Sequence, residues 1–233
     1  MRLRYIVFIL VLSFGLGIFS CNKAARAQEH GSPQSNARYN AMSSQLLSGE
    51  TDFSYDAYRK YYLNSRYYNP VPEDVKAEIL NLAYIIQTSE VEEDVAAARY
   101  GYETLVKEQL ANVEIVSLAL SLSKKDKRFG SVKLFERLRA GLFEQVINSG
   151  NGTTLDDAYD VISPAEARML LSYLDVSVLQ TMSGREGYYY YSMYDVEDRK
   201  TGQPRTIFVN STFLQNHLDK LEEDKPAVLD LRY

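Results

Sequence analysis

The apolar residues of this chain recur with a helical period from Thr51 to Ser149, and the period changes after Gly150. Apolar residues spaced three and four apart predict amphipathic helices, whereas short alternating runs predict strands. Both patterns in separate halves are typical of an α+β protein. We therefore predict a mostly helical fold in which residues 51–149 are helical and residues 150–233 form a small α/β part, the two making one folded unit.

The helical half predicts a Tyr-rich helix followed by two antiparallel helix hairpins. Asp52-Phe53-Ser54 offers N-caps for the first helix, and Asn69-Pro70-Val71-Pro72 ends it. The hairpins span Val75–Lys107 and Asn112–Ile147, an offset of about 37 residues that is close to the ~34 of a tetratricopeptide unit. Tetratricopeptide-like pairs and a plain helical bundle are both open.

The second half predicts short strands and two short helices. Ser163-Pro164-Ala165-Glu166 indicates a helix start with Ser163 as its N-cap, and a closing helix runs through Phe213 and Leu218. The last two strands join through a polar turn and predict an antiparallel hairpin. Strands are expected at Asp157–Ser163, Val176–Met182, Tyr188–Val196 and Thr206–Asn210.

A short basic and then apolar leader ends at Cys21, which is the single cysteine of the chain. That order is typical of a bacterial secretory signal peptide over residues 1–20, with Cys21 resembling a lipoprotein attachment site. The resemblance implies that the Cys21 thiol is diacylated, that the leader is cut before Cys21, and that the new amino terminus is acylated. Two or more acyl chains hold a protein stably on a membrane, so we expect a membrane anchor here. An ordinary signal peptide and an uncleaved anchor are the alternatives.

Residues 21–50 are expected to hold the lipidated Cys21 and a flexible linker, because Asn22 to Met42 is polar and shows no apolar period. The expected location is the periplasmic side of a bacterial membrane, the outer membrane before the inner. The formal net charge of −5 argues against nucleic acid as a partner, since phosphates require a basic stripe. An envelope protein or a cell-wall partner fits this setting better.

Two groups of residues resemble the bacterial family catalogued as domain of unknown function 4919. The similarity covers about Thr51 to Leu218, and it implies the fold and export rather than an activity. The family carries an Asp where this chain has Asn151, which removes a charge from the loop. The residues that carry the resemblance are Asp52-Phe53, Arg59, Tyr62, Ser65, Tyr68-Asn69-Pro70, Gly141-Leu142-Phe143, Ser149–Thr154, Ala158–Ser163, Glu166, Leu170-Leu171, Tyr194-Asp195-Val196, Lys200-Thr201-Gly202 and Thr206–Asn210.

The candidate partner- or ligand-binding residues lie on the Tyr-rich helix and in the glycine loop. Arg59 is expected to pair with Asp52 or a later carboxylate, or else to contact a ligand. Gly150 is expected to be the left-handed C-cap of the preceding helix and Asn151-Gly152 a tight turn, with an anion or calcium site as the alternative. The full set is Asp52, Arg59, Tyr62, Tyr68, Asn69, Ser149, Gly150, Asn151, Gly152 and Thr154.

Catalytic patterns are poor in this sequence. His217 stands alone on the closing helix without a nucleophile-elbow motif, and zinc-ligand spacing is absent. The run Tyr188–Tyr191 should place two rings on each face of a strand. We therefore expect no cofactor and no metal, and a non-enzymatic binding or scaffold module at the cell envelope. The alternatives are a protein that binds cell-wall glycan or another small ligand, and a hydrolase that uses carboxylates or His217.

Overall fold

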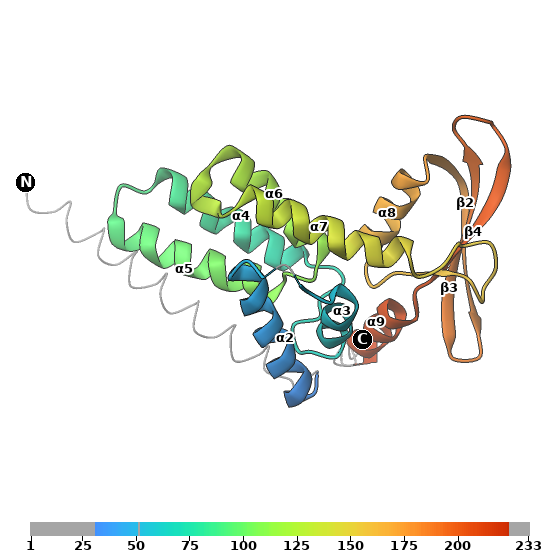
Figure 1. Cartoon of the computed structure of the whole chain (residues 1–233), viewed down its shortest axis with the longest axis horizontal. Helices are drawn as coiled ribbons and strands as arrows, with labels where there is room; N and C mark the ends of the chain where they lie inside the picture. Colours follow the sequence, from blue (N-terminus) through green and yellow to red (C-terminus); the bar gives the residue numbers. More distant parts are fainter. Residues whose placement is uncertain (1–30, 51, 224–233) are drawn as a thin grey trace, which may run out of the picture.

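The computed structural model describes residues 31–50 and 52–223, so the predictions for the leader and Cys21 lie outside the described residues. The molecule is elongated, with helix hairpins at one end and a small sheet at the other (Figure 1). The α+β prediction is confirmed. The elements are α2 (Pro33–Leu47), α3 (Tyr55–Leu63), α4 (Glu73–Thr88), α5 (Glu92–Glu108), α6 (Val113–Lys125), η1 (Lys127–Phe129), α7 (Val132–Ile147), β1 (Tyr159–Asp160), α8 (Pro164–Tyr173), β2 (Val176–Glu186), β3 (Tyr189–Asp198), β4 (Pro204–Asn210) and α9 (Thr212–Glu223).

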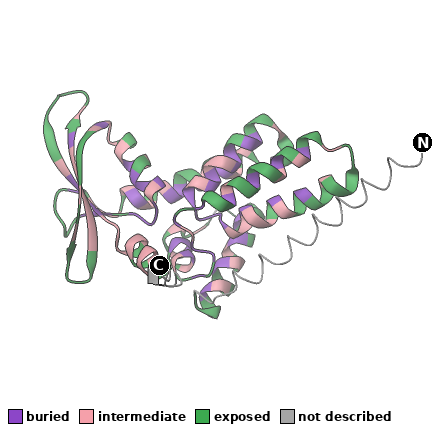
Figure 2. Ribbon diagram, turned by 180° about the vertical axis from the view of Figure 1, so that it is seen from behind, coloured by how far each residue is buried: buried purple, intermediate pink, exposed green. Residues whose placement is uncertain are grey.

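The two predicted hairpins form as α4–α5 and α6–α7, whose helices pack against each other in pairs. Helices α3 and α6 begin at side-chain caps, whereas α4 and α5 begin after Pro72 and Val91 without one. The Ser54 hydroxyl caps α3 by accepting from Ala57, and the Asn112 side chain caps α6 in the same way. The buried faces of these helices meet in one core, which includes Ile79, Leu138 and Leu142 at 0% exposure. Figure 2 shows buried residues along the facing sides of the helices.

The expected linker is wrong beyond Ser32, because residues 33–47 form helix α2. Ser32 caps this helix and Pro33 occupies its first turn, where a missing N–H is not needed. Tyr39 and Leu46 are fully buried in the helical core. The apolar period of this helix is not visible in the sequence, because the buried face that holds Tyr39 and Leu46 also contains the polar residue Ser43. The Ser43 hydroxyl lies 2.8 Å from the Tyr58 hydroxyl.

The sheet has the strand order β1-β4-β3-β2, and it is mixed. Strands β2, β3 and β4 pair antiparallel, which confirms the predicted hairpin. The strand expected at Asp157–Ser163 shortens to β1, which pairs parallel with β4. One face of the sheet packs on α7 and α8 through a second core that includes Val146, Leu170 and Val196.

Helix α7 belongs to both cores, because Leu138 and Leu142 lie in the helical core and Val146 lies under the sheet. It runs from the hairpin end of the molecule to the sheet (Figure 1). Helix α7 therefore joins the helical core to the core under the sheet. Among the described residues, no helix combines the length and the apolar character needed to cross a membrane.

Candidate functional site

Arg59 is buried and pairs with Glu166 on α8, not with Asp52. The Arg59 Nη2 atom lies 2.6 Å from Glu166 Oε2, and the same nitrogen donates to the Asp160 carbonyl at 2.8 Å. Asp52 is exposed at the chain's surface. The expectation of a later carboxylate holds, and Arg59 connects α3 with β1 and α8. It acts as a positioning residue because it fixes the backbone of Asp160.

The Glu166 carboxylate has a second partner besides Arg59, the backbone N–H of Ile162. The Ser163 hydroxyl caps α8 by accepting from the Glu166 N–H, as predicted. The Glu166 carboxylate turns back and accepts from the Ile162 N–H at 2.8 Å. Complete burial raises the pKa of Glu166, while Arg59 and the Ile162 N–H act in the opposite direction. This carboxylate is therefore a structural group and does not reach solvent.

Tyr62, Tyr68 and Asn69 belong to the packing around this ion pair. The Tyr62 hydroxyl donates to Gln109 at 2.8 Å and accepts from the Asn69 N–H at 3.1 Å. The Tyr68 hydroxyl donates to the Ile162 carbonyl at 2.7 Å. Burial raises the pKa of both tyrosines far above the ordinary value, so they act as neutral hydrogen-bonding groups. Tyr62 is not available to a ligand, because its side chain is 1% exposed.

The loop from Ser149 to Thr154 is a structural turn. Gly152 has a positive φ of 69°, as a tight turn requires, whereas Gly150 does not, so the left-handed C-cap expected at Gly150 is wrong. Gly150 is needed for another reason: a Cβ there would lie 2.4 Å from the Asp157 carbonyl. The Asn151 side chain accepts from Thr153, and the Thr154 hydroxyl accepts from the Asp157 N–H. The polar groups of the loop are thus engaged within the loop and with the residues that flank it.

A hollow of about 620 Å³ lies on the outer face of the sheet, opposite the face that packs on α8. Strand register places one row of side chains across it: Asp160 pairs with Asn210, Asn210 with Tyr191, and Tyr191 with Gly184. The Asn210 amide donates to the Asp160 carboxylate at 2.7 Å. Ser149 lies at the rim, and its hydroxyl accepts from the Asp160 N–H. Of the candidate binding residues, Ser149 alone lines this hollow.

Tyrosines dominate the hollow. The tip of the Tyr191 ring lies over Gly184, where an added Cβ would be 2.6 Å from it. Tyr189 stands on the same face and is 65% exposed, and Tyr188 in the hairpin turn is 86% exposed. Tyr190 points to the opposite face, where its hydroxyl donates to Asp219 on α9. The predicted alternation is confirmed for Tyr189, Tyr190 and Tyr191, whereas Tyr188 lies in the turn and not in the strand where it was expected.

The charged side chains that line this sheet hollow are all acidic, and Arg185 lies next to the lining, where it donates to the Gly187 carbonyl. Asp156, Asp160 and Glu186 line it, and the lining contains neither Lys nor Arg. Within residues 31–50 and 52–223, no three His, Cys, Asp or Glu side chains gather closely enough to hold a metal ion. The arrangement therefore disfavours anions and offers aromatic surface with polar acceptors.

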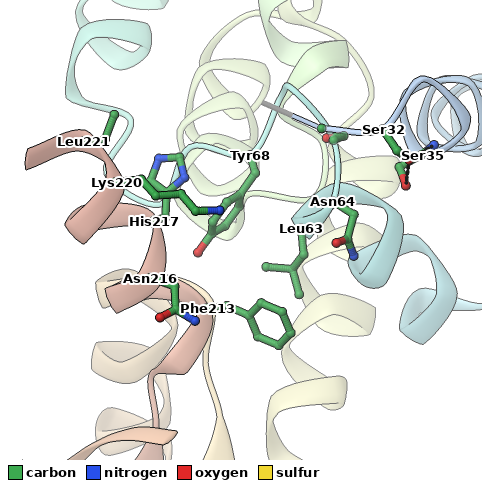
Figure 3. A pocket seen from close by; sticks show the side chains of 12 residues that line it. Ser32, Ser35, Leu63, Asn64, Tyr68, Phe213, Asn216, His217, Lys220 and Leu221 are labelled. Carbon is green, nitrogen blue, oxygen red and sulfur yellow. Dashed lines mark hydrogen bonds between the residues drawn. The ribbon is translucent and has the colours of Figure 1, made fainter. Parts of the chain in front are cut away.

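A second hollow, of about 560 Å³, contains His217 and lies between α2, α3 and α9. The His217 ring packs edge-on against Tyr68 with centroids 4.9 Å apart, and Figure 3 shows the two rings together with Lys220. Ser32, Ser35 and Ser65 also line it, but no Asp or Glu is among its described lining residues. The Ser32 and Ser65 hydroxyls serve caps and turns. The described residues that line this hollow therefore supply no acid for a Ser-His-acid arrangement.

Sequence reasoning missed the row of Asp160, Asn210 and Tyr191. Each comes from a different strand, so their proximity depends on pairing between residues far apart in the chain. The available signal was the run Tyr188–Tyr191 in a predicted strand, since an alternating run exposes two rings on one face.

No protein-family model, curated protein or solved structure gives a significant match to this chain. The resemblance based on the sequence motifs stays a prediction, and the functional argument rests on the residues themselves.

Proposed function

We propose that this chain is a non-enzymatic, lipid-anchored module of the bacterial cell envelope that binds a glycan in the sheet hollow. The observation that carries the proposal is the cross-strand row in which Tyr191 pairs with Asn210, whose amide donates to the Asp160 carboxylate. In this proposal the helix hairpins are the scaffold, and the α/β part carries the binding site.

A sugar ring has the two kinds of surface that this hollow complements. Its C–H face is apolar and stacks on aromatic rings, for which tyrosine supplies a rigid area with a polar tip. Its hydroxyls donate to carboxylates and accept from amides, and the row offers both through Asp160 and Asn210. Exposed Tyr188 and Tyr189 extend the aromatic area toward the hairpin turn. A hollow of this size holds a short stretch of glycan.

The charges narrow the ligand class. Three carboxylates line the hollow without a basic side chain, so a phosphate, a nucleic acid or another polyanion would be repelled. An uncharged glycan meets no such penalty. Ligands that carry amines are also compatible with the negative charge of the hollow. A polyamine is therefore the comparison in the binding test.

The binding test is a calorimetric titration of the full chain in detergent with chitotetraose, an uncharged oligosaccharide of N-acetylglucosamine. The proposal expects saturable binding, whereas inorganic phosphate and spermidine bind much more weakly. Preferential binding of spermidine would replace the glycan by a cationic ligand. Mass spectrometry of the recovered sugar is the control, because cleavage would indicate a carboxylate-dependent hydrolase.

The anchor is tested separately through Cys21. Replacement of Cys21 by Ser should abolish incorporation of labelled palmitate and release the chain from the membrane fraction, since the thiol is the attachment atom. A Ser variant that still sediments with membranes, beside a wild type that takes up no label, would contradict the anchor. That result would leave the glycan site untouched.

A further inference from the structure

The chain enters the fold at a fixed point beside the His217 hollow. The Ser32 N–H donates to the Asn64 carbonyl at 3.1 Å. Gly31 lies so close to the next segment that a Cβ on it would be 2.4 Å from the Arg66 nitrogen. Gly31 and Ser32 both line the hollow. The chain that follows Cys21 therefore meets the fold at the wall of this hollow, at Gly31 and Ser32.

The reach of that segment is short. Nine residues separate Cys21 from Gly31. Even a fully extended chain of this length spans only about 35 Å. The sequence alone suggested a longer tether, but α2 begins at Pro33 and removes the additional length. An acylated Cys21 therefore keeps this end of the domain close to the lipid surface.

The exposed side chains at this end suit a lipid interface. Phe213 and Leu221 on α9 are 52% and 45% exposed, which is high for large apolar residues. Lys220 and His217 line the hollow between them. The backbone of Arg66, whose side chain is exposed, lies against Gly31. Figure 3 shows Phe213, Lys220 and Leu221 along the α9 side of the hollow.

Helix α9 carries three acids, Asp219, Glu222 and Glu223, and the first of them is engaged by hydrogen bonds. The Asp219 carboxylate accepts from the Tyr190 hydroxyl at 2.9 Å and from the Gln215 amide at 2.7 Å. It is thus engaged on the side of α9 that faces the sheet. The described lining of the hollow itself contains no carboxylate.

We propose that this end of the domain rests on the phospholipid surface, with α9 lying along the interface. Phe213 and Leu221 enter the headgroup boundary, and Lys220 contacts lipid phosphates. The proposal rests on the lipid attachment at Cys21. It also sets the orientation of the module, because the helix hairpins then extend away from the contact made by α9 (Figure 1).

The chain has no tryptophan, so a single introduced one reports its own surroundings. The acylated full chain carrying Phe213→Trp is placed in vesicles of phosphatidylethanolamine and phosphatidylglycerol that contain brominated acyl chains. The control is Val91→Trp at the α4–α5 turn, because Val91 and Phe213 are both 52% exposed. We expect several-fold stronger quenching of Phe213→Trp than of Val91→Trp.

A charge reversal tests the role of Lys220 in the same experiment. Lys220→Glu added to Phe213→Trp should reduce the quenching, whereas Lys133→Glu, on exposed α7 surface away from the hollow, should not. Flotation of the vesicles reports the anchor independently. Equal quenching of the two tryptophans in floating protein would overturn the orientation alone, and protein that does not float would overturn the anchor and the orientation together.

Discussion

Arg59 of α3 and Glu166 of α8 form a buried ion pair of 2.6 Å that joins the helical half to the α/β half. Their side chains are 9% and 2% exposed. The Arg59 guanidinium also holds the Asp160 carbonyl, so the pair fixes the strand that carries one wall of the sheet hollow. The ion pair thus connects the stability of the fold with the geometry of the proposed site.

Replacement of Arg59 by Ala should destabilise the protein by about 3–5 kcal/mol, because Glu166 would remain buried without its partner. The neighbouring Lys60 provides the control. Its ion pair with Asp56 is exposed at 70% and 62%, so Lys60→Ala should change stability by about 0.5 kcal/mol or less. Urea unfolding measures both. An unchanged midpoint for Arg59→Ala would show that Arg59 is a ligand contact and not a scaffold residue.

The pH dependence of stability should follow the raised pKa of Glu166. A carboxyl group whose pKa is higher in the folded state holds its proton more tightly there than in the unfolded chain. Its contribution is therefore complete below the ordinary value of about 4.3 and is lost as the pH rises through the folded-state pKa.

The measurement is the free energy of unfolding of wild type and Glu166→Gln between mildly acidic and neutral pH. The stability of wild type relative to the Gln variant should fall as the pH rises. If the relative stability rises instead, the attraction of Arg59 outweighs burial and the pKa of Glu166 is lowered.

The two halves should unfold in a single transition. Helix α7 places Leu142 in the helical core and Val146 in the core under the sheet, and Tyr68 binds the Ile162 carbonyl between them. Few contacts cross a true domain boundary, whereas these contacts are buried. Calorimetry of the chain should show one endotherm with equal calorimetric and van't Hoff enthalpies. Two separated endotherms would indicate independent domains.

Replacement of Gly184 by Ala should weaken glycan binding more than it affects stability. The added methyl group would meet the tip of the Tyr191 ring, which can swing away at a small cost of about 1 kcal/mol. The ring would then leave its position over Gly184, in the row that crosses the hollow, and affinity for chitotetraose should fall several-fold. Gly101→Ala in α5 is the control, with unchanged affinity. Full affinity in the Gly184 variant would show that the ring position is irrelevant.

Local patterns in the sequence predicted most element starts, because caps act over three or four residues. Ser54 and Ser163 cap the helices that they were expected to cap. Helix α2 escaped prediction because its buried face includes Ser35 and Ser43, which look like linker residues until their hydroxyl partners are known. Burial of a small polar side chain depends on a partner elsewhere in the chain.

The candidate site was less predictable for the same reason. The partner of Arg59 lies 107 positions later, and Glu166 read simply as part of a helix cap. The row from Asp160 to Tyr191 requires both a parallel and an antiparallel pairing, and no local spacing encodes such a combination. By contrast, the two tyrosine faces followed directly from strand alternation.

The central claim is that exposed tyrosines of the sheet hollow bind a glycan, and one matched pair of variants tests it most directly. Tyr189 in the hollow and Tyr84 on α4 are both 65% exposed. Calorimetric titration with chitotetraose should show about tenfold weaker binding for Tyr189→Ala, which corresponds to a loss of about 1.4 kcal/mol, and wild-type binding for Tyr84→Ala. Equal affinities for the two variants, or no binding by wild type, would contradict the proposed function.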